Sequence, residues 1–245
     1  MTQETALPRF DDKVALVTGA SRGIGRTLAK ALALQGAHVI ATARTKGALE
    51  ELDDEVTAAG GRISLLQLDL KEAEQIDTLG PTLYKRWQRL DIFVGNAGIL
   101  GALTPLGHIR EKDWSEAIAV NLTANWRLIR TLDPILRLSS AGRVLFITSG
   151  AAHRCRAYWG TYSVTKAGLD ALAKTYAHET QSTPLRVNLF DPGKLRTRMR
   201  RLAYPGEDEN TLLPPEAIVP LALSLLTEET EKNGEIVLFK PEGAQ

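Results

Sequence analysis

Cysteine is nearly absent, since Cys155 is the single one among 245 residues. An internal disulfide is therefore excluded, and a reducing compartment is expected. The sequence also lacks a run of eighteen apolar residues, and its start, MTQETALPRFDDK, lacks the basic-then-apolar pattern of a secretory signal. An excess of one charge is missing too, because the formal net charge is +1. We expect a cytoplasmic protein without nucleic-acid or membrane partners.

Metal-ligand spacing is also lacking. The four histidines, His38, His108, His153 and His178, do not stand at the intervals of a metal site. Cys155 has no base near it in sequence, which favours a packing role over a nucleophilic one. We predict no metal.

What the chain does have is a regular alternation of short β-branched runs and longer amphipathic runs, without a repeat or a linker. The apolar runs are continuous, as a sheet buried on both faces requires. The alternation predicts one doubly wound α/β domain, with a mostly parallel seven-stranded sheet and helices on both faces. Strands are expected at 13–18, 37–42, 62–68, 91–95, 142–148, 185–190 and 234–239, and helices at 23–35, 46–59, 72–88, 113–138, 162–180 and 215–227.

The stretch TGASRGIG (18–25) follows the first strand and precedes a helix. Gly19, Gly23 and Gly25 permit a tight turn and a close approach of the backbone to a pyrophosphate. The helix N-terminus adds free N–H groups and a partial positive charge. Glycines also mark plain turns, but this placement in a βαβ unit predicts dinucleotide binding.

Two arginines occupy the turns that distinguish the nicotinamide cofactors. Arg44 follows the second strand, and Arg22 lies inside the glycine turn. An acidic residue after the second strand would hold the ribose 2′-hydroxyl of NAD, whereas guanidiniums pair with the 2′-phosphate of NADP. Either arginine alone would be compatible with a solvated surface position, but the two together favour NADP(H) over NAD(H).

Polar residues follow the next strands. Asp69, after the third strand, is placed to bind an adenine edge, and Asn96, after the fourth, is placed to bond backbone between cofactor and loop. Both residue types are also common in plain turns. Their position makes them candidates, because ligands of open α/β sheets bind beyond the carboxyl ends of the strands.

A chemical unit is predicted from Ser149, after the fifth strand, and from TYSVTKAG (161–168). Tyr162 and Lys166 are four residues apart, so they share one face of a helix. An ammonium beside a phenol favours the phenolate and lowers the tyrosine pKa. A hydroxyl that holds a substrate oxygen, a phenol that transfers its proton and an ammonium that tunes the phenol form an acid–base unit. Asn121 is a further candidate, because asparagine is unfavourable inside a helix.

Taken together, TGASRGIG, NAG (96–98), Asn121, Ser149, YSVTK (162–166) and PGKLRT (192–197) resemble the short-chain dehydrogenase/reductase family, over essentially the whole chain. The resemblance implies a single NAD(P)-binding Rossmann-fold domain over 1–245, with an N-terminal extension at 1–11 and a substrate lid at 193–216. It also implies reversible hydride transfer between a nicotinamide and a carbonyl/alcohol pair, in a homodimer or homotetramer.

The resemblance further implies roles for single residues. Tyr162 is expected to be the acid/base, Ser149 to orient the substrate oxygen, Lys166 to tune the tyrosine and hold the ribose, and Asn121 to position a water in a proton relay. The expected cofactor-binding residues are Thr18, Gly19, Ser21, Arg22, Gly23, Ile24, Gly25, Arg44, Asp69, Leu70, Asn96, Ala97, Gly98, Tyr162, Lys166, Pro192, Gly193 and Thr197.

Three features depart from the family pattern. Gly95 stands where an asparagine is common, and Asp191 stands before the proline–glycine pair where a small residue is usual. The tail GEIVLFKPEGAQ lacks the usual aspartate–glycine–glycine ending, which weakens the expectation of a tetramer.

Several residues outside these motifs are also candidates. The arginines Arg196, Arg198, Arg200 and Arg201 of the lid could bind an anionic substrate, but pairing with Glu207, Asp208 and Glu209 is the favoured interpretation. His153 and Arg154 are expected to face solvent more than substrate. Trp114 and Trp126 fit either a packed helix face or a subunit interface.

The sequence thus predicts an NADP(H)-dependent oxidoreductase for a small carbonyl/alcohol substrate. A catalytically silent nucleotide-binding scaffold or redox sensor of the same fold is the alternative, and an epimerase or dehydratase that recycles its cofactor is a second one.

Overall fold

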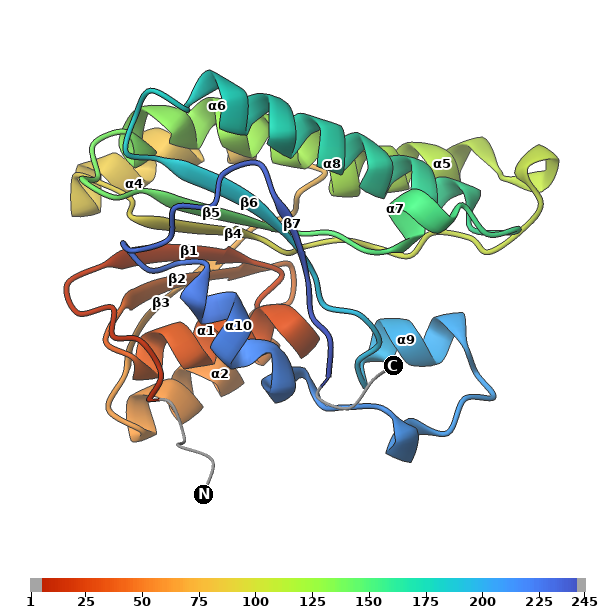
Figure 1. The fold of residues 1–245 in the computed structure, drawn as a ribbon, viewed down its shortest axis with the longest axis horizontal. Helices are drawn as coiled ribbons and strands as arrows, with labels where there is room; N and C mark the ends of the chain where they lie inside the picture. The colour runs from red at the N-terminus through yellow and green to blue at the C-terminus, as the bar shows by residue number, and fades with distance from the viewer. Residues whose placement is uncertain (1–5, 242–245) are drawn as a thin grey trace.

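Seven strands form one sheet in the computed structural model, which describes residues 6–241. Their order is β3-β2-β1-β4-β5-β6-β7 and every neighbouring pair is parallel, which confirms the predicted doubly wound fold (Figure 1). The order reverses between β1 and β4, so the crevice of the fold opens there. The strands are β1 (Val14–Thr18), β2 (His38–Ala43), β3 (Arg62–Gln67), β4 (Ile92–Gly95), β5 (Arg143–Ile147), β6 (Arg186–Asp191) and β7 (Ile236–Leu238).

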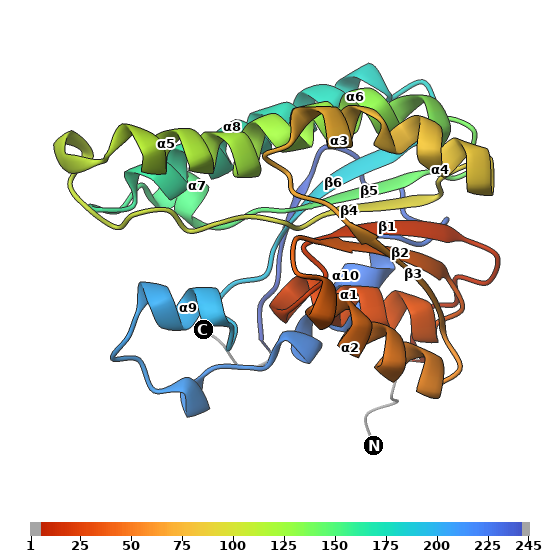
Figure 2. The same cartoon turned by 180° about the vertical axis from the view of Figure 1, so that it is seen from behind.

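Helices cover both faces of the sheet. On one face lie α1 (Gly23–Leu34), α2 (Lys46–Ala58) and α10 (Val219–Ser224). On the other lie α4 (Leu79–Trp87), α6 (Ala124–Leu136) and α8 (Gly160–Glu179), as Figures 1 and 2 show. The remaining helices are α3 (Ala73–Asp77), α5 (Glu111–Ile118), α7 (Ala151–Arg154) and α9 (Arg198–Ala203).

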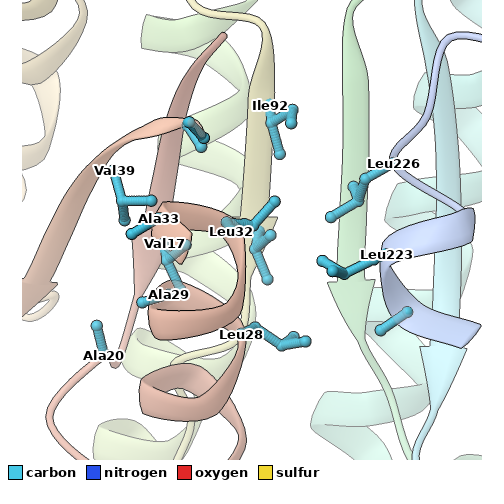
Figure 3. Close-up of a cluster of buried hydrophobic side chains, with 14 of the residues drawn as sticks. Val17, Ala20, Leu28, Ala29, Leu32, Ala33, Val39, Ile92, Leu223 and Leu226 are labelled. Atoms are coloured by element: carbon cyan, nitrogen blue, oxygen red, sulfur yellow. The ribbon is translucent and has the colours of Figure 1, made fainter. Parts of the chain in front are cut away.

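Each face has its own apolar core. In α1, apolar side chains recur at helical spacing, so Leu28 and Leu32 are fully buried against Val17 of β1 and Leu223 of α10 (Figure 3). This packing fixes the start of α1 against the end of β1, where the glycine turn lies.

Two predicted helices are interrupted. The expected helix at 72–88 breaks at Thr78, whose hydroxyl bonds the carbonyls of Glu74 and Gln75. The expected helix at 113–138 contains a π-helical turn over Ala119–Thr123, which carries Asn121. A π turn inserts one extra residue into a helix and redirects a side chain, and such turns are frequent at functional sites.

The predicted N-terminal extension is in part integrated into the domain. Phe10 is 3% exposed within the core around α1, and its N–H donates to the carbonyl of Gln35 at 2.8 Å. Residues 1–5 of the extension and the last four residues of the tail lie outside the described part of the chain. Within 6–241, no helix has the length and apolar character needed to cross a membrane.

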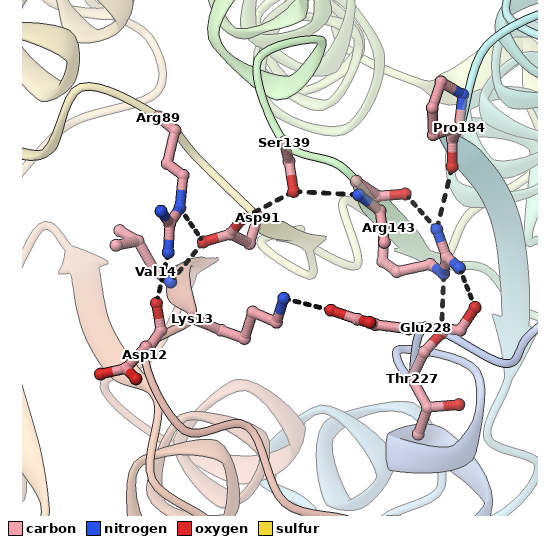
Figure 4. Close-up of polar contacts among 12 residues, drawn as sticks. Asp12, Lys13, Val14, Arg89, Asp91, Ser139, Arg143, Pro184, Thr227 and Glu228 are labelled. Carbon is pink, nitrogen blue, oxygen red and sulfur yellow. Dashed lines mark hydrogen bonds and ion pairs between the residues drawn. The ribbon is translucent and has the colours of Figure 1, made fainter.

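A buried carboxylate, Asp91, connects the segments at the amino-terminal ends of the central strands, opposite the crevice. Asp91, 2% exposed, accepts hydrogen bonds from the Val14 N–H at 2.9 Å, from Arg89 Nε at 3.0 Å and from the Ser139 hydroxyl at 2.6 Å (Figure 4). The neighbouring buried Arg143 donates to the backbone carbonyls of Gly142, Pro184, Thr227 and Glu228.

Asp91→Ala should lower the free energy of unfolding by about 3 kcal/mol, because a buried N–H and a buried hydroxyl lose their acceptor. Urea denaturation followed by circular dichroism measures this loss. The control is Asp11→Ala, which removes a carboxylate that is 61% exposed and paired with Arg9. That change should leave the free energy of unfolding close to that of the parent, and equal losses in the two variants would contradict the role given to Asp91.

Candidate active site

Hydrogen bonds of the Thr18 and Asn96 side chains connect the glycine turn to the end of β4. The Thr18 hydroxyl accepts from the N–H groups of Asn96 and Ala97 at 3.0 and 3.1 Å. Asn96 Nδ2 donates to the carbonyls of Thr18 and Gly19 at 2.8 and 3.3 Å. These bonds hold the ends of β1 and β4 together at the point where the sheet order reverses.

Two glycines of the turn are required by geometry. Gly19 has a φ of 68°, and a Cβ there would lie 2.9 Å from Ala97 Cα. A Cβ on Gly25 would lie 2.4 Å from the Gly19 carbonyl oxygen and 2.3 Å from Asn96 Nδ2. The absence of both side chains allows α1 to begin directly at the turn.

The N-terminus of α1 has the properties of an anion site. Its first turn contains no acidic residue, and no side chain caps it. Free N–H groups and the helix dipole therefore remain available for a negatively charged group.

Arg22 and Arg44 line the cleft beside this helix end. Both are exposed, and neither forms an ion pair with a residue in the described part of the chain. Two guanidiniums without an ion-pair partner in the described residues therefore lie in the part of the cleft where the sequence predicts a 2′-phosphate. Asp69 and Leu70 line the same end, with Asp69 Oδ1 accepting from the Lys71 N–H at 3.0 Å.

The chemical end of the cleft contains Ser149, Tyr162 and Lys166. Ser149 follows β5, while Tyr162 and Lys166 lie one turn apart on α8. Lys166 Nζ lies 5.8 Å from the centre of the Tyr162 ring and donates to the Ile147 carbonyl at 2.7 Å. Because Ile147 ends β5, this bond joins α8 to the strand that precedes Ser149.

Burial shifts the acid–base properties of both groups on α8. It raises the pKa of Tyr162 to about 12, with Asp191 adding to the shift and a hydrogen bond with Ser149 opposing it. Burial lowers the pKa of Lys166 to about 8, against the opposing charges of Asp170 and Asp191. The direction for Tyr162 is opposite to that expected from the neighbouring ammonium, because burial disfavours the charged phenolate and is the largest cause of the shift. At neutral pH Tyr162 is protonated.

Asn121 lies behind the cleft surface and is fully buried. Its Oδ1 accepts from the Ile99 N–H at 2.8 Å, and its Nδ2 donates to the Ile99 carbonyl at 2.9 Å and to the Thr165 hydroxyl at 3.0 Å. A Cβ on Gly98 would lie 3.2 Å from Asn121 Oδ1 and 3.8 Å from Lys166 Nζ, so the two side chains approach the same point. The π turn therefore aims Asn121 at the loop after β4 and at α8.

Most of the residues predicted for the site line this one cleft. Thr18, Gly25 and Asn121 are the exceptions, and they support the lining residues from behind. The residues that line it are Gly19, Ser21, Arg22, Gly23, Ile24, Arg44, Asp69, Leu70, Asn96, Ala97, Gly98, Ser149, Tyr162, Lys166, Pro192, Gly193 and Thr197.

The segment predicted as a lid, 193–216, is held by contacts among its own residues. Its two ends meet at a bridge between Leu195 and Leu213, and Arg200 and Arg201 pair with Glu207 and Glu209. The favoured interpretation of these charges, mutual pairing, holds for these two arginines. Arg198 lines the cleft instead, together with Met199, Arg200 and Ala203.

Trp159 is a cleft residue that the sequence did not single out. Its ring centre lies 6.0 Å from that of Tyr162 and 5.6 Å from that of Tyr204 in the lid segment. The only signal in the sequence was its position one turn before the tyrosine. His153 and Arg154, which were expected to face solvent more than substrate, are exposed and do not line the cleft.

Gly95, one of the departures from the family pattern, is explained by packing. A Cβ there would lie 2.5 Å from the Phe146 ring and 3.0 Å from Asn125 Oδ1, so a larger residue does not fit. Across the described residues, no three His, Cys, Asp or Glu side chains gather as metal ligands.

Comparisons with known proteins identify the family of this chain. A family profile described as short chain dehydrogenase matches residues 13–208. The uncharacterized oxidoreductase YciK of Escherichia coli K12 is 34% identical over 227 residues, which are 91% of this chain and 90% of that protein. The 3-oxoacyl-[acyl-carrier-protein] reductase FabG of the same organism is 33% identical over 192 residues, or 78% and 77% of the two chains.

A solved short-chain dehydrogenase of Shigella flexneri 2a, in complex with NADP, superimposes with a TM-score of 0.91 at 33% identity, over 95% of this chain and 99% of its own. The chain therefore belongs to the short-chain dehydrogenase/reductase family and is an oxidoreductase of that family.

Gly25→Ala should weaken NADPH binding by at least ~10-fold, because the new methyl group would push α1 away from the Gly19 carbonyl. Fluorescence titration with NADPH measures the change. Gly47→Ala is the control, since a Cβ at this helical position of α2 meets no atom within 4 Å. It should bind NADPH like the parent, and unchanged binding by Gly25→Ala would show that this contact does not shape the cofactor site.

Proposed function

We propose that this protein is an NADP(H)-dependent oxidoreductase that interconverts a carbonyl and an alcohol, with Tyr162 as the acid/base. The observation that carries the proposal is the convergence of Ser149, Tyr162 and Lys166 on the cleft that contains the glycine turn. The N-terminus of α1 would hold the phosphates of a dinucleotide, and Ser149, Tyr162 and Lys166 would lie at the other end of the same cleft.

The residues present fit NADPH. The N-terminus of α1 is free to bind the pyrophosphate, and Arg22 and Arg44 are free to bind a 2′-phosphate. A similar chain was solved with NADP, which supports the same cofactor here. When bound, NADPH would supply the hydride to the carbonyl carbon.

The chain's own residues supply the proton and hold the oxygen. The Ser149 hydroxyl donates to the substrate oxygen, and the buried Tyr162 hydroxyl gives that oxygen its proton as the C–H bond forms. The Lys166 ammonium stabilises the phenolate that remains. Because burial keeps Tyr162 protonated at neutral pH, the site as folded is in its proton-donating state.

The substrate end favours a small or medium apolar carbonyl compound. Leu100, Val120, Trp159, Met199 and Ala203 are among the residues that line the cleft, and Arg198 is the cleft arginine from the lid without an ion-pair partner in the described part of the chain.

Tyr162→Phe should lower kcat for carbonyl reduction by at least ~100-fold, because the proton donor is removed. NADPH binding should persist, since the ring remains. Tyr176→Phe is the matched control, because Tyr176 is also buried on α8 but donates to Asp133 away from the cleft. Full activity in Tyr162→Phe would contradict the proposed acid/base, whereas NADPH binding by the parent without carbonyl reduction would favour the nucleotide-binding scaffold.

Arg44→Asp should weaken NADPH binding at least ~10-fold more than NADH binding, because a carboxylate repels the 2′-phosphate and accepts from a 2′-hydroxyl. Titration of both cofactors measures the ratio. Arg110→Asp introduces the same charge change at an exposed position outside the cleft, and it should leave the ratio unchanged. Equal losses for both cofactors in Arg44→Asp would overturn the NADP assignment.

A further inference from the structure

A buried carboxylate on α8 has no role in the steps above. Asp170 is one helical turn after Lys166 on α8 and is 4% exposed. The spacing of four residues puts both side chains on the same face of the helix. A buried aspartate is unfavourable unless its surroundings stabilise its charge, so this one requires an explanation.

Asp170 is hydrogen-bonded to Thr148, the residue that stands between Ile147 and Ser149. The Thr148 hydroxyl donates to Asp170 Oδ1. Thr148 stands between Ile147, whose carbonyl anchors Lys166 Nζ, and Ser149 of the cleft. The Asp170 carboxylate is therefore bonded to the residue that directly follows the Lys166 anchor, Ile147, and directly precedes Ser149.

The other oxygen of Asp170 faces an imidazole ring. His153 Nε2, from α7, lies 3.2 Å from Asp170 Oδ2 without the alignment of a hydrogen bond, and its ring is 59% exposed. Lys166 and Lys174 of α8 also favour the ionised carboxylate, while burial raises its pKa. Thr148, His153 and the two lysines thus oppose the desolvation of the charge.

We propose that Asp170 is a positioning residue whose buried carboxylate keeps the Lys166 side chain cationic and anchored on the Ile147 carbonyl beside Tyr162. The inference rests on the proposed function for its catalytic meaning, but the effect on Lys166 can be measured without turnover. Asp191, at the end of β6, is the other carboxylate whose charge acts on Lys166, so the effect of removing Asp170 is partial.

The geometry defines an informative variant. In Asp170→Asn the side-chain oxygen still accepts from Thr148, and only the negative charge is lost. In Thr148→Val the charge remains and only the hydrogen bond is lost. Glu179→Gln removes the same charge from an exposed position on α8, so it serves as the matched control.

The experiment is a pH titration of the Lys166 13Cε chemical shift, assigned by its absence from the spectrum of Lys166→Arg. The Lys166 midpoint of Asp170→Asn should fall at least ~0.5 pH unit below that of the parent, because an unopposed buried ammonium loses its proton more easily. The alkaline limb of kcat/KM for carbonyl reduction should move in the same direction. Glu179→Gln should move neither quantity, and Thr148→Val should move the midpoint less than Asp170→Asn.

An unchanged Lys166 midpoint in folded Asp170→Asn would overturn the proposal, as would an equal shift in Glu179→Gln. If Asp170→Asn does not fold by circular dichroism, Asp170→Ser carries the same prediction. The proposed function fails in a different way, through absence of carbonyl reduction by the parent protein, whatever the titration shows.

Discussion

The hydrogen bonds between Thr18 and Asn96 are the constraint on which the site depends. A parallel sheet whose strand order reverses between β1 and β4 has a crevice there, and these bonds fix the two strand ends that border it. They in turn place the glycine turn, and with it the N-terminus of α1. The shape of the cleft around the glycine turn therefore depends on the bonds between Thr18 and Asn96 and on the packing of α1 on the sheet.

At the other end of the cleft, burial and charge oppose each other. Tyr162 and Lys166 are both removed from water, which favours the neutral phenol and weakens the hold of the lysine on its proton. The carboxylates Asp170 and Asp191 and the carbonyl of Ile147 counter the second effect. The result at neutral pH is a protonated Tyr162, which is the form that can give a proton to a carbonyl oxygen.

Much of this arrangement was predictable from local patterns. The seven strands follow from continuous apolar runs. The glycine turn follows from its placement between the first strand and a helix, and the YSVTK stretch from the spacing of Tyr162 and Lys166 together with the family resemblance. What escaped prediction depends on tertiary contacts. The π turn around Asn121 arises because that side chain bonds Ile99 and Thr165, and Trp159 gains its place through a partner in the lid, Tyr204.

The direction of the Tyr162 pKa also escaped prediction, since helical spacing shows the neighbouring ammonium but not the depth of burial. The most direct test of the account is a titration of the purified protein with NADPH and with NADH, followed by nicotinamide absorbance over a panel of aldehydes, ketones and quinones. The account predicts NADPH-selective binding and carbonyl-dependent oxidation of NADPH. Failure to bind either cofactor would contradict it.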